Sequence, residues 1–68
     1  MNKSNVKDLI LKLLQSNEGG VTKENIVDYL DYVNKVRYTS DEMDHFLSEL
    51  SKEKKVKNIN DLWYIANR

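Results

Sequence analysis

The chain has 68 residues, in which eleven lysine and arginine residues balance eleven aspartate and glutamate residues, and it has no cysteine. This length fits one small domain, expected over residues 1–68, and the lack of cysteine excludes disulfides and thiolate metal sites. No apolar run approaches the roughly 18 residues of a membrane span, and residues 1–5 lack a signal-peptide pattern, so we expect a cytoplasmic protein with no membrane partner.

The first predicted element is a helix over residues 4–17. Its apolar residues recur at steps of three and four positions: Val6, Leu9, Ile10, Leu13 and Leu14. This spacing places them on one face of a helix. Leu11 falls outside that face, so we expect it to be exposed, either as an isolated leucine or as a dimer contact. The helix should end at the glycines at positions 19 and 20, because glycine adopts the left-handed cap conformation without strain.

A second helix is predicted over residues 23–35. Thr22 is a suitable N-cap, and Val21 before it can pack against the first turn of the helix. The apolar positions expected to be buried are Ile26, Val27, Leu30 and Val33. Tyr29 and Tyr32 flank this stripe, where tyrosines usually pack through their rings and keep the hydroxyl in water.

A third helix is predicted over residues 40–54. Thr39 and Glu42 have the spacing of a capping box, in which each side chain bonds the backbone amide of the other residue. The inward positions are Met43, Phe46, Leu47 and Leu50. The outward positions are Asp41, Asp44, His45, Ser48, Glu49 and Lys52. The outward face therefore has three acids against one lysine, a net charge of −2.

The last predicted element is a β-hairpin over residues 56–66, which turns at Asn60 and Asp61. Its residues are rich in β-branched and aromatic side chains, and alternate side chains of a strand point to opposite faces. We therefore expect Trp63 and Ile65 to face the core together. Leu62 and Tyr64, on the other face of the strand, are expected to point outward or toward a partner of the hairpin.

The sequence gives no indication of catalysis, so we expect no enzyme and no cofactor. His45 is the only histidine, and it has neither a cysteine nor a second histidine with which to form a nucleophilic pair or a zinc site. Asp41 and Asp44 lie near His45 in the sequence, but we expect a solvated helix start there rather than a metal site. The two glycines are not followed by the Lys-Ser/Thr pair of a phosphate-binding loop.

The order of three helices and a hairpin, with Gly-Gly-Val-Thr before the second helix and Leu62-Trp63-Tyr64-Ile65 at the end, resembles the winged helix-turn-helix family. The resemblance covers nearly the whole chain. It implies a mainly α fold, a three-helix bundle plus a small β-hairpin as the wing, with a one- or two-residue strand near Val21 that pairs with the hairpin. In DNA-binding members of the family, the third helix lies in the major groove and the wing contacts the backbone or the minor groove.

This resemblance favours a small DNA-binding module, a transcription-associated regulator that contacts phosphates of double-stranded DNA mainly through the wing and the end of the third helix. The basic residues assigned to this role are Lys35, Arg37, Lys52, Lys54, Lys55 and Lys57. The lysines between positions 52 and 57 can equally be a solvated helix end and a protected strand edge. The balanced total charge argues against a non-specific DNA binder, which is usually basic.

Two other hypotheses stay open at the level of sequence. The first is a protein-interaction domain that docks on a basic protein surface of a transcription or replication assembly. The residues assigned to that docking face are Asp41, Asp44, His45, Ser48 and Glu49. The second is a homodimer that forms through Leu11, Tyr29 and Tyr32.

Overall fold

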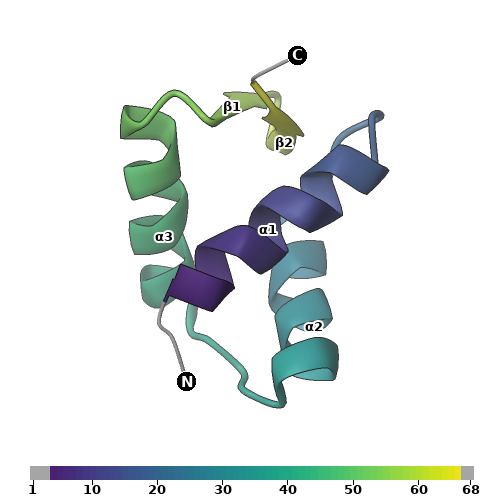
Figure 1. Ribbon diagram of the computed structural model, residues 1–68, viewed down its shortest axis with the longest axis vertical. Coiled ribbons are helices and arrows are strands. Elements are labelled where there is room, and N and C mark those ends of the chain that lie inside the picture. The colour runs from purple at the N-terminus through teal and green to yellow at the C-terminus, as the bar shows by residue number, and fades with distance from the viewer. Residues whose placement is uncertain (1–3, 67–68) are drawn as a thin grey trace.

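Residues 4–66 form three helices followed by a two-stranded antiparallel hairpin. The computed structural model describes the backbone of these residues and the side chains of residues 6–66. The elements are α1 (Ser4–Ser16), α2 (Lys23–Asn34), α3 (Ser40–Lys52), β1 (Val56–Ile59) and β2 (Leu62–Ile65). Figure 1 shows α1 crossing α2, α3 standing to one side, and the hairpin closing the end opposite the α2–α3 turn. The mainly helical, winged-helix-like arrangement that the sequence predicts is thus confirmed.

The predicted helix starts are confirmed by their caps. The Thr22 hydroxyl accepts a hydrogen bond from the Asn25 amide at 3.2 Å. In the capping box of α3, the Glu42 amide donates to the Thr39 hydroxyl at 3.1 Å, and the Thr39 amide donates to the Glu42 carboxylate at 2.9 Å. Each cap satisfies amides that a helix start leaves unpaired, and a cap of this kind typically stabilises a fold by about 1 kcal/mol.

The helix ends differ slightly from the predicted ones because non-glycine residues adopt left-handed backbone conformations there. Lys35 has φ 62° and caps α2, and its amide donates to the Asp31 carbonyl at 3.0 Å. Lys54 also has φ 62°, so α3 ends at Lys52, two residues before the predicted end. The chain then turns directly into β1.

The α1 stripe is confirmed, but its neighbour Leu11 is not exposed as predicted. Val6, Ile10 and Leu14 are buried in the core. Leu11 is half-buried and packs against the edge of the core. The reason is that Leu11 borders a groove between α1 and the end of α2, where Val33 lies on the other side.

The predicted α2 stripe is correct at Ile26 and Leu30, but Val27 is only half-buried and the prediction is wrong at Val33. Ile26 and Leu30 are fully buried, whereas Val33 keeps 41% of its surface exposed. Tyr29 is half-buried at the core, and Tyr32 is 79% exposed. The last turn of α2 reaches toward the end of the molecule opposite the hairpin, so the other elements cover less of it (Figure 1).

The core is completed by α3 and the hairpin. Met43, Leu47 and Leu50 of α3 are buried, as predicted. Phe46 is only half-buried and meets the Tyr38 ring edge-on, with 5.5 Å between the ring centroids. None of the helices in the described part of the chain has the length and apolar character that crossing a membrane requires.

The hairpin has the predicted turn. Val56 pairs with Ile65, and both side chains are buried. Asn60 and Asp61 have positive φ values of 52° and 67°, which suit the tight turn of a two-residue hairpin loop. Ile59 and Leu62, the residues on either side of this turn, therefore pair directly.

Val21 adds a short third strand to the hairpin, as the family resemblance implies. Its amide donates to the Trp63 carbonyl at 3.0 Å, and the Trp63 amide donates to the Val21 carbonyl at 2.8 Å. Trp63 packs on the core beside buried Ile65, as predicted. These two hydrogen bonds anchor the hairpin to the segment before α2.

Leu62 and Tyr64, predicted to point outward or toward a partner of the hairpin, are both half-buried. They pack on Gly20, which has φ +96°. A Cβ atom at Gly20 would lie 2.8 Å from Tyr64 Cζ and 3.0 Å from Leu62 Cβ, so only glycine fits this turn. The face of β2 opposite the core is therefore covered by the α1–α2 turn.

Candidate nucleic-acid interface

The outward face of α3 lies where periodicity places it, and two of its three acids form ion pairs with lysines. Asp41, Asp44, His45 and Ser48 are exposed, and Glu49 is half-buried. Asp44 accepts from the Lys23 ammonium group at 2.9 Å, and the same group donates to the Ser40 hydroxyl at 2.8 Å. The start of α2 is thereby tied to the first turns of α3, and one of the three acids of the predicted acidic face is neutralised.

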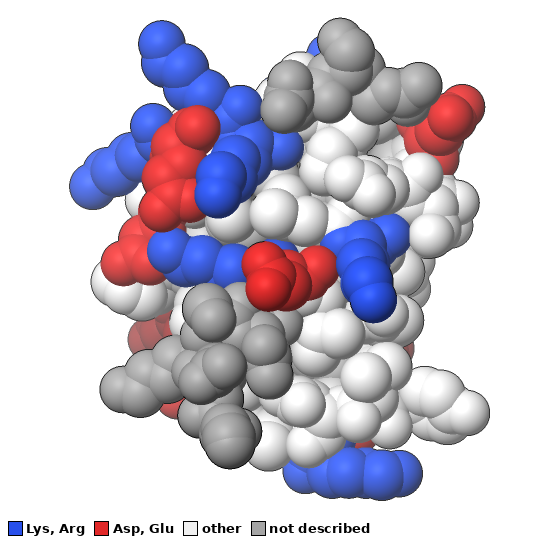
Figure 2. Space-filling view, viewed as in Figure 1, with Lys and Arg blue, Asp and Glu red and all other residues white. Residues whose placement is uncertain are grey.

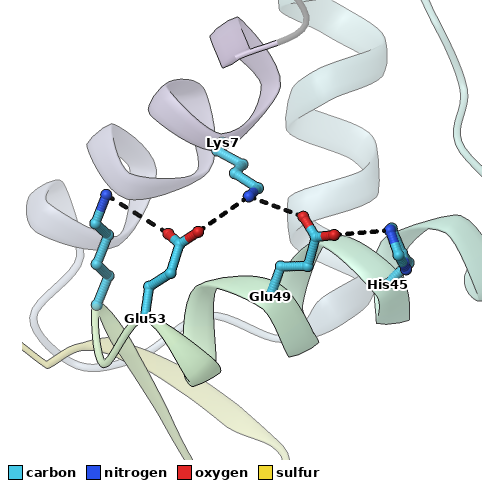
Figure 3. Close-up of polar contacts among 5 residues, drawn as sticks. Lys7, His45, Glu49 and Glu53 are labelled. Carbon is cyan, nitrogen blue, oxygen red and sulfur yellow. Dashed lines mark hydrogen bonds and ion pairs between the residues drawn. The ribbon is translucent and has the colours of Figure 1, made fainter.

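A second group of ion pairs joins α1 to α3 (Figure 3). The Lys7 ammonium group lies 2.8 Å from the Glu49 carboxylate and 3.3 Å from the Glu53 carboxylate. His45 Nε2 lies 3.0 Å from Glu49, and Lys55 Nζ lies 3.6 Å from Glu53. The hydrogen bond from Lys7 is the main cause that lowers the pKa of Glu49, and the bond to Glu49 is the main cause that raises the pKa of Lys7.

These pairs predict a pH-dependent effect of removing Lys7. A carboxyl group whose pKa is lower in the folded chain than in the unfolded chain stabilises the fold above its unfolded pKa, about 4.3 for glutamate, and loses that contribution as the pH falls through its folded pKa. We therefore expect Lys7→Met to lower the urea midpoint at about pH 7, and the difference from wild type to shrink below about pH 4. Urea titrations followed by Trp63 fluorescence at several pH values measure this.

The matched control for Lys7→Met is Lys57→Met. Lys57 is exposed and has no ion pair among the described residues. Its replacement should leave the urea midpoint near the wild-type value at every pH. A Lys7→Met deficit of the same size at neutral and acidic pH would contradict the assignment of the effect to the Glu49 carboxylate.

The structure does not bring Lys35 and Arg37 together with the other predicted phosphate contacts. Both lie in the α2–α3 turn, at the opposite end of α3 from the hairpin (Figure 1). Arg37 Nη1 donates to Asp28 and Asp31, each at 3.1 Å, and these bonds raise the pKa of Arg37. The Lys35 ammonium group lies 5.8 Å from the centre of the Tyr32 ring. The Arg37 guanidinium is thus already held by two carboxylates.

The remaining predicted contacts lie together between the end of α3 and the start of β1, in a stretch that we call the lysine segment. It consists of Lys52, Lys54, Lys55 and Lys57, all of them exposed. Figure 2 shows basic side chains, with acidic ones between them, over the end of α3 and the start of the hairpin. Within the described part of the chain, only Lys55 of these four takes part in an ion pair, the 3.6 Å contact with Glu53.

The backbone holds the lysine segment in a defined shape. The Lys54 amide donates to the Ser51 carbonyl at 2.9 Å, and the Lys55 amide donates to the Leu50 carbonyl at 3.0 Å. The Ala66 amide then donates to the Lys55 carbonyl at 2.9 Å, which ties the segment to the end of β2. Lys54 and Lys55 therefore project from a hydrogen-bonded turn, between Lys52 at the end of α3 and Lys57 in β1.

The other side of the hairpin has the opposite charge. A depression between the hairpin turn and the start of α2 is bordered by the acids Glu24, Asp44 and Asp61, with Lys23 as its single basic residue. A phosphate backbone would be repelled there. The sequence analysis missed this acidic depression, because its residues come from three elements that are distant in the chain.

Within the described residues, no group of three histidine, aspartate or glutamate side chains is arranged to hold a metal ion. Comparison of the chain with protein-family models, curated proteins and solved structures gives no significant match.

Proposed function

We propose that this protein is a double-stranded DNA-binding module of the winged helix-turn-helix type, a transcription-associated regulator acting in the cytoplasm. The observation that carries the proposal is the lysine segment, where four exposed lysines, only one of them in an ion pair among the described residues, lie between the end of α3 and the start of the hairpin. Such groups attract phosphates, because binding them releases counterions from the DNA.

The ion pairs of α3 favour DNA over a basic protein surface as the partner. The alternative hypothesis requires the acids of α3 to be available for docking. Asp44 is paired with Lys23 and Glu49 with Lys7, so of the three acids assigned to that face only Asp41 has no ion pair among the described residues. The same pairs weaken the repulsion that these acids would exert on nearby phosphates.

The proposed contacts position the protein on DNA but read little sequence. Phosphate contacts carry no direct sequence information, and α3 contains no arginine that could bind guanine edges. The first turn of α3 carries Asp41 and Glu42, which are unsuited to a deep approach between phosphates. We therefore propose binding dominated by the phosphate backbone at the end of α3 and the start of β1, where four lysines outnumber the single acid Glu53 although the whole chain has no net charge.

A titration of a mixed-sequence DNA duplex at several salt concentrations tests the proposal. Four phosphate contacts give a slope of about −3 to −4 in a plot of the logarithm of the association constant against the logarithm of salt concentration. We expect weakening with salt and little difference between duplex sequences. Absence of binding at low salt, or binding that salt leaves unchanged, would contradict the proposed function.

A further inference from the structure

A groove between α1 and the end of α2 is bordered by apolar side chains, and one of the exposed large apolar residues, Val33, lies on it. Leu9 and Leu11 of α1 and Val33 of α2 border the groove. Within residues 6–66, the exposed large apolar side chains are Tyr32, Val33, Val36 and Ile59. Three of these four lie on the last turn of α2 or just after it. Exposed apolar residues gathered at one place are typical of an interaction surface.

Two charged residues of opposite sign lie on the α1 side of the same groove. Asp8 and Lys12 border it, and both are exposed. Neither forms an ion pair with another described residue, in contrast to Lys7, Lys23 and Arg37. They are four positions apart, so they lie one turn apart on the same side of α1, about 6 Å along its axis.

We infer that this groove docks a second copy of the same chain, with the two α1 helices antiparallel across a two-fold axis. A two-fold interface joins identical surfaces. If residue i of one copy contacts residue j of the partner, then residue j of the first copy also contacts residue i of the partner. Antiparallel α1 helices place Asp8 of each copy beside Lys12 of the other, forming two equivalent ion pairs. Leu11 lies between these positions in the sequence, and the apolar side chains around it meet their counterparts near the axis.

The location of the groove is compatible with the lysine segment being free in both copies. The groove lies over α1 and the last turn of α2, whereas the lysine segment lies at the end of α3 beside the hairpin (Figures 1 and 2). The two surfaces share no residue. Dimerisation is therefore independent of the proposed DNA binding, and either one can fail without the other.

Light scattering coupled to size exclusion tests the inference on the whole chain without DNA, at roughly 100 µM, where a dimer with a micromolar Kd is largely populated. We expect a dimeric mass for the wild type and a monomeric mass for Val33→Glu, because a carboxylate would then be buried among apolar side chains. Ile59→Glu is the matched control, since Ile59 is similarly exposed but lies on the hairpin; it should stay dimeric.

A charge swap separates specific docking from general stickiness. Asp8→Lys alone places two lysines opposite each other at both ends of the interface and should raise the dimer Kd about a hundredfold. Adding Lys12→Asp restores opposite charges at both positions, so the double variant should dimerise again. The inference is overturned if the wild type is monomeric, even if another molecule covers the groove. It is also overturned if the Val33→Glu variant is still a dimer or if the double variant stays monomeric. Far-ultraviolet circular dichroism confirms that each variant is folded.

Discussion

Replacing Lys54 and Lys57 with glutamine lowers the affinity for duplex DNA by about tenfold to a hundredfold at low salt, if the lysine segment contacts phosphates. Both side chains are exposed and have no ion pair among the described residues, so no intramolecular attraction competes with DNA for them. The salt slope should fall in magnitude by about 2, which corresponds to two lost phosphate contacts. Fluorescence anisotropy of a labelled duplex, repeated at several salt concentrations, measures both quantities.

The matched control is the double variant Lys35→Gln with Arg37→Gln. It changes the net charge by the same amount, so any long-range attraction to DNA is reduced equally. Arg37 is held by Asp28 and Asp31 at the far end of α3. We expect the DNA affinity and the salt slope of this control variant to stay close to those of the wild type. If the two double variants lost affinity equally, net charge alone would explain binding, and the lysine segment would have no special role.

The largest expected effect on stability follows from truncating the core residue Leu30. Leu30 is fully buried in α2, and a Leu→Ala change at such a position costs about 2–5 kcal/mol. A domain of 68 residues without disulfides has only a few kcal/mol of stability, so this loss approaches the total. We expect Leu30→Ala to be largely unfolded at about 37 °C, as measured by circular dichroism during thermal and urea denaturation.

Val33→Ala is the control for this change, because it lies one turn later on the same helix but is 41% exposed. At low protein concentration, the Val33→Ala substitution should change the free energy of unfolding by less than about 0.5 kcal/mol. Comparable destabilisation by the two variants would mean that Val33 is buried, as its place in the apolar stripe predicted, and would contradict the packing described for the end of α2.

The features that the sequence predicted well are local in the chain. The Thr22 cap and the box formed by Thr39 and Glu42 depend on residues three positions apart, so their chemistry can be recognised without knowledge of the fold. The turn at Asn60 and Asp61 is equally local. Periodicity also gave the buried faces of α1 and α3, because it follows from helix geometry alone.

The features that the sequence missed depend on which element covers which surface. Val33 follows the spacing of the α2 stripe, but no other element covers it completely. Tyr64 alternates outward along β2, yet the turn at Gly20 lies against it. Periodicity fixes the direction of a side chain and says nothing about the neighbour that it meets.

The same limit explains why the predicted charge roles changed. Lys7 and Glu49 are 42 positions apart, and their ion pair exists only because α1 packs beside α3. The sequence predicts that Arg37 contacts phosphates, but in the fold its guanidinium is paired with Asp28 and Asp31. Of the six predicted phosphate contacts, the four in the lysine segment therefore form the candidate interface.

The central claim is that DNA contacts the end of α3 and the start of β1. Recording amide chemical shifts of the isotope-labelled protein during titration with a DNA duplex tests it most directly. The account predicts that the largest shifts occur between positions 51 and 58, with small changes at the acidic depression near Asp61 and at Arg37. Shifts centred on the α2–α3 turn or on the acidic depression, or no shifts at all, would contradict it.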